Sequence, residues 1–246
     1  MKLFCSIILI LFISSFAKAE INIAVAANMK GTADLLVTDF NKIHKNIKVN
    51  IVSASSGELY QQIINGAPFQ LFISADTSFP EKIVEKKLSQ NKPHIYAYGQ
   101  LVIAIPNSKI VINNINDITN TDIQYIAIAN PKLAPYGKVA MEILNNQKLY
   151  DKIKNKIVSG NSLNDINQLV FSKSVDIAFT NKSALILQND VKYYEIPTSL
   201  YNPIPQGMVL IKTEDKTKST EANTFYNFIK SSEGKQILVN SGYIVK

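Results

Sequence analysis

The hydrophobic pattern of the chain alternates between short apolar runs and stretches with helical spacing. The first run, at 21–27, is continuous and rich in β-branched residues, as expected for a strand that is buried on both faces. Apolar residues then recur three or four positions apart, which is typical of an amphipathic helix. The first half of the chain predicts strand 21–27, a helix carrying Leu35, Leu36, Phe40 and Ile43, strand 48–54, helix 58–64, strand 71–75 and an amphipathic segment at 80–88.

A longer apolar strand at 98–106 opens a second cycle of the same kind. The elements expected after it are strand 125–129, helices 138–146 and 164–171, strand 176–180, strand 206–211 and a last helix carrying Ala222, Phe225, Phe228 and Ile229. Strands that alternate with helices predict βαβ units, in which a mostly parallel sheet is flanked by helices. Two such cycles, closed by a returning tail, predict an α/β protein with two lobes.

The amino terminus has the pattern of a secretory signal peptide. Lys2 precedes an apolar run at 3–16, and residues 17–19 form a small-x-small cleavage pattern. The run is shorter than the roughly 20 residues of a membrane span, so we expect cleavage near Glu20 and an exported, soluble protein rather than a membrane-anchored one. Cys5 lies inside the run and not just after it, which argues against a lipoprotein.

Composition excludes several kinds of site. Cleavage after residue 19 removes Lys2 and Lys18 from the 26 basic residues, leaving 24 against 19 acids, a net charge of +5, and no cysteine. Disulfides, thiolate metal sites and cysteine nucleophiles are therefore excluded from the mature chain. The lysines are scattered, which does not predict binding to nucleic acid. The chain has no arginine, so it cannot form a bidentate guanidinium clamp on an anion.

Small polar residues that open a helix follow three of the expected strands. They are Ala26-Ala27-Asn28, Ala54-Ser55-Ser56-Gly57, and Ala129-Asn130-Pro131 with Pro135-Tyr136-Gly137. In open α/β sheets ligands bind beyond the carboxyl ends of strands, where helix starts present free N–H groups to anions. Ser56 can donate its hydroxyl and its N–H, and Asn28 its carboxamide. Each alone is also a common helix cap, but their recurrence predicts a shared oxyanion site with neutral donors.

Six segments of the sequence carry a resemblance to a known family. They are 24–28, 55–63, 66–68, 71–76, 129–137 and 201–206. In these segments the chain resembles the periplasmic molybdate-binding proteins of bacterial ABC transporters. The resemblance implies a two-lobed type II binding-protein fold that closes on molybdate or tungstate and delivers it to an inner-membrane ABC permease. The anion contacts that it implies are Asn28, Ser56, Tyr136 and Leu163, with a fifth at Asn181 or its neighbour Thr180.

The resemblance also implies how these residues act. Tyr136 and Leu163 would bind through main-chain N–H groups, so their side chains need not be polar. Many members have Ser where this chain has Asn28, which still provides a donor. The segments 159–163 and 176–181 match the family pattern more loosely than the others. We expect residues 20–98 and 203–246 to form the first lobe and residues 99–202 the second.

The chemistry of oxyanions leaves two alternatives open. Molybdate, tungstate and sulfate are fully deprotonated at neutral pH and only accept hydrogen bonds, so a receptor for sulfate or another oxyanion is the first alternative. A periplasmic serine hydrolase using Ser56 is the second, but it would need a histidine base, and we expect structural roles for both His44 and His94. Two isolated histidines provide no metal-cation site. We therefore expect a monomeric binding protein, not an enzyme, without a cofactor.

Overall fold

The computed structural model describes residues 19–187, 191–202 and 204–246. The predicted signal peptide, except for Ala19, and Pro203 at the expected boundary between the lobes lie outside the described residues. Within the described ranges, every helix is too short or too polar to cross a membrane.

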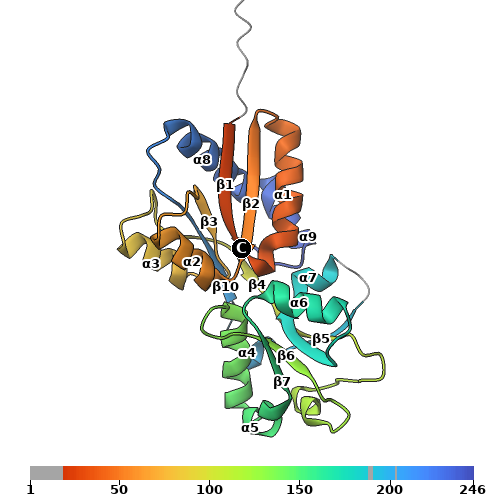
Figure 1. The fold of residues 1–246 in the computed structure, drawn as a ribbon. Helices are drawn as coiled ribbons and strands as arrows, with labels where there is room; N and C mark the ends of the chain where they lie inside the picture. The colour runs from red at the N-terminus through yellow and green to blue at the C-terminus, as the bar shows by residue number, and fades with distance from the viewer. Residues whose placement is uncertain (1–18, 188–190, 203) are drawn as a thin grey trace, which may run out of the picture.

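The first lobe is built on a five-stranded sheet with the strand order β2-β1-β3-β10-β4 (Figure 1). Its strands are β1 Ala19–Ala26, β2 Ile47–Ala54, β3 Leu71–Ile73, β4 His94–Gly99 and β10 Ile204–Leu210. β1 pairs in parallel with β2 and β3, whereas β10 runs antiparallel to β3 and β4. Ile21 and Ile23 of β1 pack on one face of the sheet and Ala24 on the other. Helices on both faces explain why the inner part of this strand, 23–26, is apolar on both sides.

The second lobe repeats this arrangement in a sheet with the order β7-β6-β8-β5-β9. Its strands are β5 Leu101–Ile105, β6 Ile126–Ala129, β7 Ile157–Gly160, β8 Ile177–Asn181 and β9 Lys192–Glu195. β6 pairs in parallel with β7 and β8, and β5 runs antiparallel to β8 and β9. In each sheet a single strand thus runs against the others. The predicted α/β class, with two lobes and mostly parallel sheets, is confirmed.

Helices cover the sheets, and some of them begin at the junction of the lobes. They are α1 Lys30–Ile43, α2 Ser56–Ile64, α3 Ser78–Glu85, α4 Pro135–Asn146, α5 Tyr150–Ile153, α6 Leu163–Phe171, α7 Lys182–Ile186, α8 Lys216–Lys230 and α9 Ser232–Asn240, with short 3-10 turns at Ala27–Met29, Ile115–Thr119, Lys154–Lys156 and Thr198–Leu200. In the first lobe, α1, α8 and α9 share one hydrophobic cluster, and α2 and α3 share another on the opposite face. The starts of α2, α4 and α6 follow the carboxyl ends of β2, β6 and β7.

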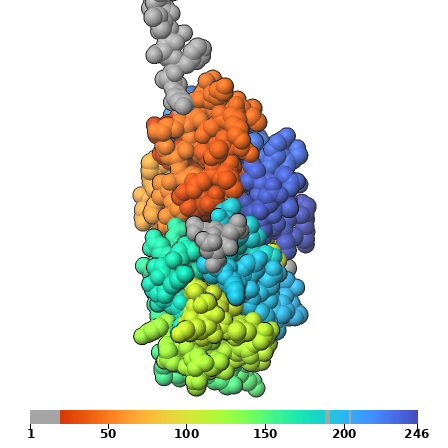
Figure 2. Space-filling model, turned by 90° about the vertical axis from the view of Figure 1, so that its right-hand side faces the viewer, coloured from red at the N-terminus to blue at the C-terminus, as the bar shows by residue number. Residues whose placement is uncertain are grey.

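The chain passes between the lobes twice. β4 of the first sheet ends at Gly99 and β5 of the second begins at Leu101, so Gln100 alone separates them. The chain returns after β9 and enters β10 at Ile204. The molecule is elongated, with the two lobes stacked end to end (Figure 2). Two short crossings at one side of the junction are the kind of connection about which lobes can rotate.

The structure corrects some of the predicted elements. The predicted strand at 98–106 is wrong as a single element, because its residues belong to β4 and β5 in different sheets. Sequence patterns also missed β7, β9, α7 and α9, which are short and mixed in polarity. On α1, Leu35 and Ile43 are 43% and 66% exposed, while Leu36 and Phe40 are fully buried. The helix was predicted correctly, but its apolar pattern overstated the width of the buried face.

Candidate oxyanion site

A small cavity lies between the lobes, at the carboxyl ends of strands from both sheets. Its cavity volume is about 10 Å³, and it is lined by Ala26, Ala27, Asn28, Ser55, Ser56, Ala75, Ala134, Pro135, Tyr136 and Leu163. Four of the five predicted contact residues are therefore brought together in one place. None of the lining residues has a charged side chain.

Ser56 presents two donors to this cavity because another residue caps its helix. The hydroxyl of Ser55 accepts the Glu58 N–H at 3.3 Å, and the Glu58 carboxylate accepts the Ser55 N–H at 3.1 Å, which forms a capping box at the start of α2. The Ser56 hydroxyl oxygen accepts the N–H of Ala75 at 3.0 Å and donates to no described residue. Its N–H lies in the first turn and has no intrahelical acceptor. Both hydrogens of Ser56 thus remain for a ligand.

Tyr136 lies at a helix start that has no side-chain cap. Ala134 is the N-cap of α4 and Pro135 its first residue, so the N–H of Tyr136 is the first one in the helix. A buried helix start needs a partner for such N–H groups. A Cβ on Gly137 would lie 2.0 Å from the Ala129 carbonyl oxygen, so only glycine lets this turn rest on the end of β6. The tight packing fixes the N–H of Tyr136 at the cavity.

The side chain of Tyr136 takes no part in this donation, which comes from the main chain. Its hydroxyl lies against Gly99, where β4 ends, and has no hydrogen-bond partner among the described residues. Burial raises the pKa of Tyr136 well above its usual value. The phenol is therefore neutral at physiological pH, and it adds no charge near the cavity.

Leu163 is the first residue of α6, which is capped in the same way as α2. The Ser162 hydroxyl accepts the Asp165 N–H at 3.3 Å, and the Asp165 carboxylate accepts the N–H groups of Asn161 and Ser162 at 2.8 and 3.1 Å. The Leu163 side chain belongs to the core of the second lobe. Its N–H has no intrahelical acceptor, which is consistent with a main-chain donor on an apolar residue.

The carboxamide of Asn28, which was expected to donate to the ligand, is already hydrogen-bonded to protein groups. Its Nδ2 donates to Gln206 Oε1 at 2.7 Å and to the Tyr243 hydroxyl at 3.1 Å. Gln206 Nε2 donates to the carbonyls of Ala75 and Ile204, both at 3.0 Å, which turns Oε1 toward Asn28. The two carboxamide hydrogens of Asn28 are therefore already in use. The donor that Asn28 retains for a ligand is its main-chain N–H.

Asn181 and Thr180 lie beside the cavity but not in its lining. Asn181 Nδ2 donates to the Asn28 carbonyl at 3.0 Å, and the Thr180 hydroxyl donates to Asn167 Oδ1 at 2.5 Å. Both residues are fully buried. In the structure both side chains are hydrogen-bonded to protein groups, and the predicted fifth contact stays a prediction.

Direct hydrogen bonds join the lobes around the cavity. The N–H of Gly57 donates to the Leu133 carbonyl at 3.0 Å, and Asn164 Nδ2 donates to the Ser53 hydroxyl at 3.3 Å. A Cβ on Gly57 would lie 3.1 Å from the Cα of Leu133. The lobes are therefore closed on each other, with donors from both facing one space.

The electrostatics of the cavity come from helix ends rather than charged side chains. The nearby carboxylate of Glu58 is used in its capping box, and the Asp76 carboxylate accepts hydrogen bonds from the Ser78 hydroxyl and the Phe79 N–H near the start of α3. The positive ends of α2, α4 and α6 meet at the cavity, an arrangement that favours anions. In the part of the chain that the structure describes, no cluster of His, Cys, Asp and Glu could hold a metal ion.

Neither histidine supports the hydrolase alternative. His44 stacks on Phe40, with ring centroids 4.5 Å apart, and His94 lies beside Tyr226 on the first lobe. Neither lines the cavity. Ser56 therefore has no histidine within reach to act as a general base.

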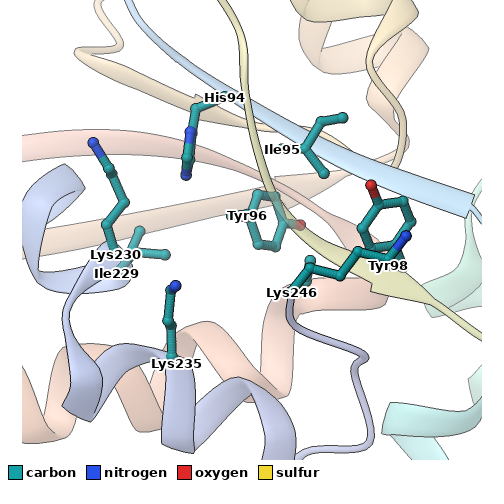
Figure 3. A pocket seen from close by; sticks show the side chains of 9 residues that line it. His94, Ile95, Tyr96, Tyr98, Ile229, Lys230, Lys235 and Lys246 are labelled. Atoms are coloured by element: carbon teal, nitrogen blue, oxygen red, sulfur yellow. The ribbon is translucent and has the colours of Figure 1, made fainter.

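A second depression lies on the first lobe alone, between β4 and the last two helices (Figure 3). Lys230, Lys235 and Lys246 surround it, and all three are exposed. Burial, followed by the charges of Lys230 and Lys235, lowers the pKa of His94. The depression contains none of the predicted contacts and no residue of the second lobe, so a ligand there would not bring the lobes together.

Sequence reasoning missed two residues that hold the site. Gln206 and Tyr243 fix the carboxamide of Asn28, from 178 and 215 positions away along the chain. No local spacing connects residues so far apart. Gln206 falls in one of the segments that carried the family resemblance, which is the only signal that could have indicated it.

Comparisons with known proteins agree with this architecture. The family model described as bacterial extracellular solute-binding protein matches residues 21–244. The molybdate-binding protein ModA of Rhodobacter capsulatus is 31% identical over 94% of this chain and 90% of its own. The periplasmic molybdate-binding protein of Azotobacter vinelandii superposes with a TM-score of 0.86 and is 29% identical, covering 92% of this chain and 99% of that one.

A third relative is the substrate-binding domain of a putative molybdenum ABC transporter from Clostridium difficile, with a TM-score of 0.69 and 28% identity over 93% of this chain and 99% of that one. These relatives are named as binding proteins, which agrees with the expectation that the chain is a binding protein rather than an enzyme. The match over nearly all described residues, at this identity and with this fold, shows that the chain belongs to the bacterial extracellular solute-binding proteins, among their molybdate-binding members.

Proposed function

We propose that this protein captures a tetrahedral oxyanion, molybdate or tungstate, in the cavity between its lobes. The observation that carries the proposal is that Asn28 and Ser56 of one lobe and Tyr136 and Leu163 of the other line one cavity without charged side chains. Main-chain N–H groups of these residues, with the hydroxyl of Ser56, would donate to the oxygens. A fully deprotonated anion accepts at every oxygen, so a cavity of donors matches it.

We infer that capture is coupled to lobe closure. The first lobe would comprise residues 20–98 and 203–246 and the second residues 99–202, with Gln100 at one crossing. A ligand that contacts both lobes binds the closed arrangement more tightly than the open one and so increases its population. The bond from Gly57 to Leu133 supports this inference, because it joins the lobes beside the cavity.

We further propose that the closed protein delivers its anion to an inner-membrane ABC permease. The names of the relatives support this role, since one is periplasmic and another belongs to an ABC transporter. Export would use the signal at residues 1–19, with the mature chain starting near Glu20, and the protein would act as a monomer.

Isothermal titration of the purified protein with molybdate, tungstate, sulfate and phosphate tests the proposal. We expect saturable binding of one molybdate or tungstate per chain, with weaker binding of sulfate and weakest binding of phosphate, whose proton would face a donor. Preferred binding of sulfate would instead support the sulfate receptor. Absence of heat with all four anions, together with binding of an organic solute, would refute an oxyanion function.

A further inference from the structure

A ring of four buried hydrogen bonds lies beside the anion cavity and joins the two lobes. The Tyr243 hydroxyl donates to the Asn28 carbonyl at 2.9 Å, and the Ser183 hydroxyl donates to the Tyr243 oxygen at 3.2 Å. Asn181 Nδ2 closes the ring by donating to Ser183 Oγ at 2.6 Å and to the Asn28 carbonyl at 3.0 Å. The Ser183 hydroxyl also lies 3.2 Å from the Asn28 carbonyl, so its one hydrogen is shared between that carbonyl and the Tyr243 oxygen, and the two amide hydrogens of Asn181 are both used. The ring is therefore chemically complete.

The members of the ring come from different lobes. Asn28 precedes α1, and the Tyr243 side chain belongs to the hydrophobic cluster of the first lobe. Asn181 ends β8 and Ser183 lies in α7, both in the second lobe. Two of the ring's bonds, from Ser183 to Tyr243 and from Asn181 to Asn28, thus exist only while the lobes are together.

Burial makes these hydrogen bonds stronger than hydrogen bonds at the protein surface. Asn28, Asn181, Ser183 and Tyr243 are each at most 4% exposed. In a medium of low polarity, linked hydrogen bonds polarise and strengthen one another. Burial also raises the pKa of Tyr243 far above its usual value, so its hydroxyl keeps its hydrogen at any physiological pH.

The ring reaches the cavity only through Asn28. Asn28 lines the cavity, whereas Asn181, Ser183 and Tyr243 do not. Tyr243 holds Asn28 on two sides, because it donates to the carbonyl and accepts from Nδ2. Holding this residue fixes the direction of its main-chain N–H, the donor that remains for an anion.

We propose that Tyr243 is a positioning residue of the anion site, and that with Ser183 and Asn181 it forms a latch that holds the closed lobes together. This inference rests on the proposed function, since the site it serves is the oxyanion cavity. The latch stabilises the closed arrangement by its own bonds and so slows release of a captured anion. It also reassigns Asn181 from ligand contact to latch member.

Single-atom substitutions test the latch in the purified protein. Tyr243→Phe and Ser183→Ala each remove one hydroxyl and leave the surrounding packing in place. We expect each to raise the molybdate dissociation rate about ten-fold, with the association rate nearly unchanged. Because both break one ring, the double variant should lose little more than either single variant. Ser183→Thr, which restores a hydroxyl, should recover most of the loss.

A control variant separates the latch from general effects on folding. Tyr226→Phe removes a hydroxyl from another buried tyrosine of the first lobe, on α8 and outside both ring and cavity. It should leave the dissociation rate unchanged. Release rates of Tyr243→Phe and Ser183→Ala equal to those of wild type or Tyr226→Phe would overturn the proposal, as would effects that simply add.

A second measurement needs no ligand. The mature chain lacks cysteine, so Lys86→Cys on the first lobe and Asn145→Cys on the second can be spin-labelled specifically. Without anion, we expect the label pair in Tyr243→Phe and Ser183→Ala to report fewer short, closed distances than in the parent. An unchanged distance distribution would contradict the latch. If the parent protein bound no oxyanion, the proposed function would fail, while these distances would still decide whether the latch exists.

Discussion

Single residues at this site would bind the anion through neutral donor groups whose hydrogens have no acceptor in the protein. Ser56 illustrates this, because Ser55 caps α2 in its place and leaves both Ser56 hydrogens available. The chain has no arginine, and no charged side chain lines the cavity. Affinity for a dianion would then depend on a small number of desolvated donors, each with a large individual effect.

We expect Ser56→Ala to weaken molybdate binding by about 1.5–3 kcal/mol, because it removes one hydrogen bond to a charged group. Isothermal titration of the variant and the wild type measures the difference directly. Ser241→Ala is a suitable control, since Ser241 is equally buried but lies outside the cavity lining. Equal affinities of Ser56→Ala and wild type would show that the anion binds elsewhere.

Helices contribute to the site through their first turns. α2 and α6 begin with capping boxes, whereas α4 begins without a side-chain cap. The boxes satisfy some of the free N–H groups at each start and leave those of Ser56 and Leu163 uncommitted. Gly57 in α2 lets the start of this helix touch the loop before α4 from the other lobe.

Gly57→Ala should affect the stability of α2 and the closure of the lobes in opposite directions. Alanine in place of glycine within a helix stabilises it by roughly 0.5–1 kcal/mol. The new Cβ would lie 3.1–3.3 Å from atoms of Leu133, so the lobes must part by a few tenths of an ångström. We expect an equal or higher melting temperature without ligand, but about ten-fold weaker molybdate binding. A variant that binds as tightly as wild type would show that closure tolerates this contact.

The whole molecule combines a positive net charge with a neutral site. Without residues 1–19 the charge is +5, spread over scattered lysines, whereas the closed cavity holds only helix ends and hydroxyls. The net charge acts at long range and attracts the anion during its approach. The buried donors act at contact distance and are little affected by salt. The association rate and the dissociation rate of the anion should therefore depend differently on ionic strength.

We expect added salt to slow association without changing dissociation. Raising ionic strength from about 0.01 M to about 0.15 M shortens the screening length from about 30 Å to about 8 Å. The molybdate association rate should fall several-fold, while the dissociation rate stays constant. Stopped-flow measurement of tyrosine fluorescence suits a chain with 11 tyrosines and no tryptophan. A dissociation rate that increases with salt would indicate a charged contact inside the closed site.

The sequence alone determined the features that depend on neighbouring residues. The alternation of β1, α1, β2 and α2, and the polar residues at strand ends, follow from spacings of a few positions, which local geometry converts directly into strands and helix starts. Topology then requires that the ends of parallel strands share one edge, so Ser56 and Asn28 could be expected near each other. Family resemblance, rather than physics, indicated Tyr136 and Leu163.

Only the tertiary structure decided which groups of these residues are free. The division of 98–106 between two sheets depends on which partners pair with β4 and β5, and no pattern within the segment encodes those partners. Asn28 offers its N–H and not its carboxamide because Gln206 and Tyr243, 178 and 215 positions away, occupy the amide hydrogens. Hydrogen bonds form between atoms that folding brings within about 3 Å, and sequence distance does not constrain which atoms those are.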